Sequence, residues 1–191
     1  MATISYLLQG PRVAIRHVGR QDYDELTALA QASAEMLRRW LGVRENTKEA
    51  FASYIKRYEQ RTHEGFVICL RSTGAIVGGV NINNIVRGSL QTGTLGYTAY
   101  ASTTGYGYMT EGLRLVIQHA FGELELHRLE ANVQPDNTSS LNLIKRLGFQ
   151  REGYSTAFQF INGAWRDHER WAITAEMAAR AEQPANRDQP H

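Results

Sequence analysis

One run of elements constrains the fold of this 191-residue chain more than any other feature: a strand, a glycine loop, a helix, a second strand and a second helix follow one another directly. Residues 94–100 predict the first strand, and residues 109–121 repeat apolar side chains at helical intervals. Residues 127–133 predict the second strand, and a polar stretch that contains Asn137 opens the second helix. This order predicts a sheet flanked by helices, in the α/β (α+β) class.

The loop before the first of these helices contains Gly105 and Gly107. Because glycine lacks Cβ, both positions reach positive φ at little cost and let the backbone approach a ligand closely. The helix that follows presents unpaired N–H groups and the positive end of its dipole, so a diphosphate can bind to backbone donors alone. A plain strand-to-helix turn would use the same glycines, and both interpretations stay open at this point.

Two other phosphate-binding loops do not fit the sequence. A dinucleotide fingerprint, G-x-G-x-x-G, would need a third glycine where Thr110 stands. A P-loop would need the tripeptide G-K-[ST], which occurs nowhere in the chain. The sequence therefore argues against both.

Three segments resemble the GCN5-related N-acetyltransferase (GNAT) superfamily: 104–113 (TGYGYMTEGL), 132–140 (NVQPDNTSS) and 146–149 (RLGF). A narrower resemblance, to the RimJ-type ribosomal-protein-alanine N-acetyltransferases, rests on four further segments. These are residues 81–89, 95–97, 152–154 and 162–168. Together the likeness extends from Val13 to about Thr174.

The resemblance implies a single-domain GNAT fold, with a mixed and mostly antiparallel sheet of about seven strands flanked by helices. We expect the N-acetyltransferase domain to span residues 1–175, and residues 176–191 to form a helix remnant and a flexible tail. The expected strands are 13–17, 65–71, 75–85, 91–100, 127–133, 154–161 and 164–174. Asn162-Gly163 predicts a type I′ hairpin turn between the last two, and Asn46 or Thr47 is expected to cap a helix that carries Phe51.

Acetyl-CoA is the acyl donor that the resemblance implies, with no metal. In this family the thioester carbonyl bonds to backbone N–H groups of the strand before the glycine loop, and that strand diverges from the next to open a cleft. The expected acetyl-CoA contacts are Tyr97, Thr98, Ala99, Thr104, Gly105, Tyr106, Gly107, Tyr108, Met109, Asn137 and Lys145.

The resemblance also suggests catalytic residues. Ile144 occupies the position at which many relatives carry a Tyr that protonates the departing thiolate, and Ser140 resembles the residue that does so in relatives without it. Asn137 would bond the pantetheine arm or hold the acceptor amine. The plainer alternatives are that Asn137 is a helix N-cap and Ser140 a tolerated helix serine.

The sequence does not identify a general base. Many relatives carry a Glu on the strand before the loop, whereas this chain has threonines there, at Thr92, Thr94 and Thr98. Asp167, His168 and Glu169 lie together near the end of the chain, and the imidazole of His168 titrates in the useful range. Glu111, in the first turn of a helix, is interpreted as structural.

The acceptor implied by the resemblance is the α-amine of a protein N-terminus, plausibly on a ribosomal protein. An α-amine titrates near 7.7–8.0 and a lysine near 10.4, so deprotonating the lysine at pH 7 costs ~3.5 kcal/mol more, and an enzyme without an evident strong base suits the α-amine. The expected acceptor contacts are Trp40, Asn83, Asn84, Arg87 and His168. An open, shallow groove there would admit a peptide, and a closed, acidic one a polyamine.

Two other functions stay open: an acetyltransferase for a small amine (polyamine, amino acid or antibiotic), and a CoA-binding sensor that has lost catalysis. The missing Tyr at Ile144, and Thr104 where the loop usually opens with Gln or Arg, keep the sensor under consideration. Turnover of any amine would exclude it.

Composition narrows the class of partner. A net charge of +2 argues against a dedicated nucleic-acid binder. The single cysteine, Cys69, excludes an internal disulfide and a multi-cysteine zinc site, and its apolar neighbours predict a core position. No apolar run approaches the ~20 residues of a membrane span, so a cytoplasmic protein, monomeric or dimeric, is expected.

Overall fold

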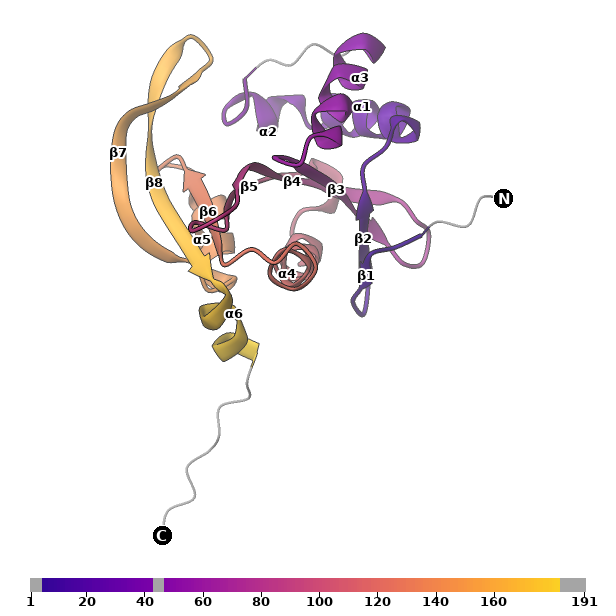
Figure 1. Ribbon diagram of the computed structural model, residues 1–191. Helices are drawn as coiled ribbons and strands as arrows, with labels where there is room; N and C mark the ends of the chain where they lie inside the picture. Colours follow the sequence, from indigo (N-terminus) through magenta and orange to yellow (C-terminus); the bar gives the residue numbers. More distant parts are fainter. Residues whose placement is uncertain (1–4, 43–46, 183–191) are drawn as a thin grey trace.

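The computed structural model describes residues 5–42 and 47–182. In these residues eight strands form one sheet, in the order β1-β2-β3-β4-β5-β6-β8-β7 (Figure 1). The strands are β1 (Leu8–Gln9), β2 (Val13–His17), β3 (Glu64–Leu70), β4 (Ile76–Val86), β5 (Thr92–Ala99), β6 (Arg128–Val133), β7 (Gln150–Ile161) and β8 (Ala164–Thr174). Neighbouring strands are antiparallel except β5 and β6, which run parallel.

Helices cover both faces of the sheet (Figure 1). One face packs against α1 (Tyr23–Ala32), α2 (Ala34–Arg38) and α3 (Lys48–Lys56). The other packs against α4 (Tyr108–Gly122), α5 (Thr138–Arg146) and α6 (Ala175–Glu182). Short 3-10 turns lie at Arg20–Asp22, Arg57–Glu59 and Ala101–Thr103. None of the helices in the described residues is long and apolar enough to cross a membrane.

Strand alternation divides the core between the two faces. Phe66 and Ile68 on β3 join the cluster beneath α4, and Val67 and Cys69 join the cluster beneath α1 and α3. Cys69 is fully buried, and burial raises the pKa of its thiol to about 11, so it stays protonated. The prediction that Cys69 is a core residue is confirmed.

Strands β5 and β6 diverge along their length. Their parallel pairing runs only from Thr92–Arg128 to Thr94–Glu130, although β5 continues to Ala99 and β6 to Val133. The facing edges beyond Thr94 are therefore not joined in a ladder, and a cleft opens between them.

The β7–β8 hairpin is long and curved, and its tip reaches the helical layer around α2 (Figure 1). Asn162 and Gly163 form its turn with φ of 52° and 77°. Two successive positive φ values are those of a type I′ turn, which confirms the predicted hairpin. The side-chain amide of Asn162 donates a hydrogen bond to the carbonyl of Arg38 at the end of α2.

The expected fold class is confirmed, with differences at the edges. Among the described residues the sheet has eight strands rather than about seven, because the two residues of β1 carry no strand pattern that could have predicted them. Strand β7 begins at Gln150 rather than Tyr154, and its pairing with β8 shifts register near Gly153.

Helix α3 begins at one of the two predicted cap residues. Thr47 caps α3 as expected, and its hydroxyl accepts a hydrogen bond from the N–H of Ala50. Asn46, the alternative cap, lies outside the described residues. The expected helix remnant is α6, and the tail predicted beyond Glu182 also lies outside them.

Candidate functional site

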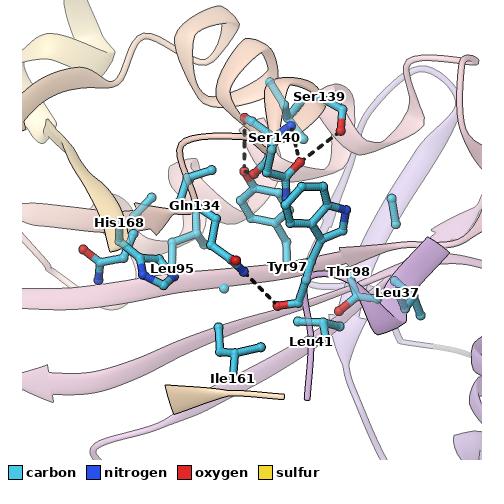
Figure 2. A pocket seen from close by; sticks show the side chains of 18 of the residues that line it. Leu37, Leu41, Leu95, Tyr97, Thr98, Gln134, Ser139, Ser140, Ile161 and His168 are labelled. Atoms are coloured by element: carbon cyan, nitrogen blue, oxygen red, sulfur yellow. Dashed lines mark hydrogen bonds between the residues drawn. The ribbon is translucent and has the colours of Figure 1, made fainter. Parts of the chain in front are cut away.

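A cavity of about 360 Å³ occupies the cleft between β5 and β6 (Figure 2). Residues from Thr94 to Ala99 on β5 and from Ala131 to Gln134 on and after β6 form two of its walls. The start of α5 adds Asn137, Ser139, Ser140 and Leu143. Helix α2 and the residues after it add Met36, Leu37, Trp40 and Leu41, and the hairpin adds Gln159, Ile161 and His168. Asn83 on β4 and Thr104 in the glycine loop complete the lining, so the cavity exists only where segments distant in the sequence meet.

The glycine loop leads from this cleft to the N-terminus of α4. Gly105 and Gly107 have φ of 86° and 78°, and Gly107 is the N-cap residue, without a side-chain cap. A Cβ at Gly105 would meet no atom within 4 Å, so space for a ligand lies above the loop. The free N–H groups of the first turn of α4 form a suitable site for a diphosphate.

Arg12, from the turn before β2, fixes the position of this loop. Its guanidinium donates to the carbonyl of Tyr106 at 2.9 Å and lies 5.1 Å from the centre of the Tyr108 ring. Glu111, in the first turn of α4, accepts hydrogen bonds from the backbone and side chain of Arg12 and from the N–H of Val13. Burial alone would raise the pKa of Glu111, but these hydrogen bonds outweigh it, and the pKa is lowered. The prediction that Glu111 is structural is confirmed.

The start of α5 places Ser140 on the cavity wall. The side-chain oxygen of Asn137 accepts hydrogen bonds from the N–H of Ser140 at 3.2 Å and from the hydroxyl of Ser139 at 3.1 Å. Asn137 is therefore the N-cap of α5, and it lines the cavity as well. The cap fixes the first turn, and with it the direction of the Ser140 side chain.

Ser140 shares a hydrogen bond with Tyr97 on β5. The two hydroxyl oxygens are 2.6 Å apart (Figure 2). Burial raises the pKa of Tyr97 to about 12, an effect that the bond to Ser140 only partly offsets. Tyr97 therefore keeps its proton at neutral pH and can donate it to the oxygen of Ser140.

His168 forms part of the opposite wall, on β8. Its side chain is almost completely buried, and its Nδ1 lies 3.1 Å from the backbone carbonyl of Arg166. The ring packs against Phe158 of β7, with 5.6 Å between ring centres. Burial lowers the pKa of His168, so the imidazole is neutral at pH 7.

Three contacts from two segments hold the end of α2 and the residues after it over the cavity. The side-chain amide of Gln134 donates to the carbonyl of Trp40 (Figure 2), and Arg39 forms an ion pair of 2.7 Å with Asp136. The hairpin tip contributes the bond from Asn162 described above. These contacts join α2, the β6–α5 loop and the hairpin into one rim.

A second cavity, of about 470 Å³, lies between α1, α3 and the sheet. Asn83 and Thr98 line both cavities, from the same face of β4 and β5. The side-chain oxygen of Asn83 is buried and has no hydrogen-bond partner among the described residues. The polar side chains of Asn83 and Thr98 therefore lie where the cleft cavity and the second cavity adjoin.

A family model, Acetyltransferase (GNAT) domain, matches residues 12–150. The chain belongs to the GNAT acetyltransferase family. The structure of Mycobacterium smegmatis RimJ in complex with CoA-disulfide is similar, with a TM-score of 0.81, 32% identity and coverage of 90% of this chain and 91% of that one. Acetyl-CoA is the acyl donor of this GNAT enzyme, and the open cleft and the glycine loop fit it.

The curated relatives differ in the acceptor that their names state, and one states none. The Bacillus subtilis (strain 168) protein "Probable N-acetyltransferase YjcK" is 33% identical over 174 residues, which are 87% of this chain and 96% of the relative. The ribosomal protein uS5-alanine N-acetyltransferase of Escherichia coli (strain K12) is 40% identical over 99 residues, about half of each chain. The spermidine N(1)-acetyltransferase of Escherichia coli (strain K12) is 26% identical over 166 residues, 84% of this chain and 85% of the relative.

The cavity of this GNAT domain brings together most of the residues that the sequence singled out. Those that line it are Trp40, Asn83, Tyr97, Thr98, Ala99, Thr104, Asn137, Ser140 and His168. Gly105, Tyr106, Gly107, Tyr108 and Met109 form the loop and the start of α4 beside it. The predicted roles of these residues stay predictions.

Three predicted site residues lie elsewhere. Asn84 is exposed and has a φ of 52° at an irregularity in β4, outside the cavity lining. Arg87 bonds the carbonyl of Leu124, at the other end of β4 from the glycine loop. Lys145 is exposed on α5 and lies 5.5 Å from the Trp171 ring centre.

Sequence reasoning missed several wall residues. Gln134 lies in a recognised segment but was not predicted as a site residue. Gln159 and Ile161 carry no motif, and they reach the cavity because the hairpin curves over the cleft. Tyr97 was predicted as an acetyl-CoA contact, but its side-chain bond to Ser140 was not predicted from the sequence. Among the described residues no group of three or more His, Cys, Asp or Glu side chains is arranged to hold a metal ion.

Proposed function

We propose that this GNAT enzyme acetylates the α-amine of a protein N-terminus, with an alanine-led ribosomal protein as the preferred acceptor. One observation carries the proposal: the described residues that line the cleft cavity include no Asp, Glu, Lys or Arg. A polyamine carries several positive charges, and buried ammonium groups require opposite charges nearby. An uncharged cavity suits a single amine attached to a neutral peptide backbone.

Relatives support the same assignment. The likeness to the uS5-alanine enzyme and to the RimJ structure favours a protein acceptor, and both are more than 30% identical to this chain over the matched residues. The whole-length likeness to the spermidine enzyme is weaker in identity. It makes polyamine acetylation the second candidate.

In the proposed reaction the chain positions both reactants and supplies one proton. Backbone N–H groups of Tyr97 to Ala99 would donate hydrogen bonds to the thioester carbonyl oxygen, where negative charge develops. The acceptor nitrogen bonds to the carbonyl carbon and the C–S bond breaks. Ser140 gives its hydroxyl proton to the departing sulfur, and Tyr97 donates its own proton to the Ser140 oxygen. Neutral Tyr97 is available for this because its pKa is high.

A competition assay tests the proposal. Acetyl-CoA would be incubated with a mixed pool of short peptides that differ in the first residue, lysine-only peptides with blocked N-termini, polyamines and aminoglycosides, and products read by mass spectrometry. We expect acetyl groups on α-amines of Ala- or Ser-led peptides. Acetylation of spermidine alone would establish the second candidate. No turnover of any acceptor, with CoA still bound, would indicate a non-catalytic CoA-binding protein.

A further inference from the structure

We propose that His168 is the general base of this enzyme. In this role, His168 accepts the proton that the acceptor amine loses as it becomes an amide. Only two of the described residues that line the cleft cavity have titratable side chains, Tyr97 and His168. Tyr97 is a phenol that stays protonated at neutral pH and is engaged with Ser140. His168 is therefore the one lining side chain with a free lone pair suited to a proton near pH 7.

The backbone fixes which nitrogen of His168 can act. Nδ1 lies 3.1 Å from the carbonyl of Arg166, and a carbonyl oxygen only accepts hydrogen bonds. Nδ1 must therefore carry the proton, which leaves Nε2 with its lone pair. Nε2 has no hydrogen-bond partner among the described residues, and the ring lines the cavity whose other wall carries Ser140 (Figure 2).

The surroundings keep this imidazole neutral. Burial lowers the pKa of His168, while the bond to Arg166 and the charge of Asp167, its neighbour on β8, act in the opposite direction. Strand β7 presents the uncharged Ser155 and the Phe158 ring to it. Across the cavity the titratable group is the protonated Tyr97. A neutral base is thus present at physiological pH.

The proton balance closes without another reactant. As the C–N bond forms, the acceptor nitrogen becomes strongly acidic and transfers one proton to Nε2 of His168, directly or through one water. Ser140 supplies a proton to the sulfur as the C–S bond breaks. The Ser140 oxygen is reprotonated by Tyr97, Tyr97 regains a proton from solvent, and His168 loses its proton to solvent. The net result is that one proton has moved from nitrogen to sulfur and the enzyme is restored.

A pair of substitutions separates chemistry from structure. In His168→Asn the amide nitrogen can still bond the Arg166 carbonyl, but the Nε2 base is gone. We expect kcat/KM to fall about 100-fold or more, as the loss of a general base predicts, with the Kd for acetyl-CoA unchanged. The matched control is His119→Asn, since His119 is also buried with a lowered pKa but lies on α4, outside the cavity lining.

The pH profile supplies the decisive readout. In the wild type, we calculate kcat/KM for the neutral fraction of the acceptor amine. This value should fall tenfold per pH unit below the pKa of His168, which lies under 6.5. This limb should be absent in His168→Asn and present in His119→Asn. A kcat/KM within threefold of wild type, or an unchanged limb in His168→Asn, would overturn the proposal. If His168→Asn does not fold, His168→Gln, judged by the same profile, takes its place.

The inference rests on the proposed function only in that the acceptor is an amine. The pH experiment uses whichever acceptor the competition assay finds, a peptide or a polyamine. A polyamine acceptor would therefore defeat the proposed substrate class while leaving His168 testable. A peptide acceptor with an unchanged pH limb would defeat the base assignment alone.

Discussion

At the scale of single residues, the site consists of hydroxyl and imidazole groups whose protonation is set by burial. Tyr97 is kept as a phenol and His168 as a neutral imidazole by the same cause, the loss of water around a charged form. One side chain is thereby a proton donor and the other an acceptor at the same pH. Two groups with separated pKa values are the usual arrangement of acid and base chemistry.

Replacing Ser140 by Ala removes the hydroxyl that faces the cavity and leaves the N–H that Asn137 caps. We expect kcat to fall by about 10² with little change in the Kd for acetyl-CoA, because the lost group acts mainly when sulfur departs. Steady-state kinetics and a CoA titration measure the two effects. Ser139→Ala is the control, since Ser139 also lines the cavity and bonds Asn137 but has no bond to Tyr97. Equal losses in both variants would mean that the cap, rather than the proton, was disturbed.

At the scale of elements, the glycine loop is positioned from outside its own strand and helix. Glu111 at the start of α4 accepts hydrogen bonds from the backbone of Arg12 and Val13, so it joins the start of β2 to the helix that follows the loop. The sequence predicted the loop and the helix from local pattern, because positive φ and helical periodicity are local properties. The partnership of Arg12 with Glu111, 99 residues away, has no local signal.

Glu111→Gln should lower the free energy of unfolding by about 1–2 kcal/mol at pH 7, since bonds to an ionised carboxylate are replaced by weaker ones. The folded pKa of Glu111 lies below its ordinary value of 4.5. Its stabilisation is thus complete above that value and is lost as pH falls through the folded pKa. Urea unfolding at pH 7 and pH 3.5 should show the difference from wild type shrinking at the lower pH. Glu123→Gln, at the other end of α4, should show neither effect; an E111Q deficit that does not change with pH would contradict this account.

At the scale of the whole molecule, the sequence specified the cofactor half of the site better than the acceptor half. Tyr97, Asn137 and Ser140 come from elements with strong patterns, and the cleft brings them together. The acceptor half depends on how far the hairpin curves and where α2 sits, both of which are set by tertiary packing. Arg87 illustrates the limit, since the strand that precedes it was predicted, but its side chain lies beyond the end of β4 that is away from the glycine loop.

The rim over the acceptor side gives a last prediction, because it joins segments distant in the sequence. Asn162→Gly keeps the positive φ that the hairpin turn requires and deletes only the amide that bonds the Arg38 carbonyl. The bond is exposed, so the melting temperature should change little. Because the hairpin tip is no longer bonded to α2, the variant should have a KM for the acceptor that is several-fold higher and an unchanged Kd for acetyl-CoA.

A second variant, Arg39→Ala, tests the same rim independently. It removes the exposed ion pair to Asp136 on the opposite side of the rim. Exposed ion pairs contribute at most about 1 kcal/mol to stability, so this variant too should fold normally and raise KM for the acceptor alone. If both variants acetylate the acceptor with wild-type KM, the rim does not bear on acceptor binding and the acceptor must enter elsewhere. If KM rises in both while CoA affinity holds, the hairpin and α2 together form the acceptor side of the site, and the curvature of β7 and β8 is part of its specificity.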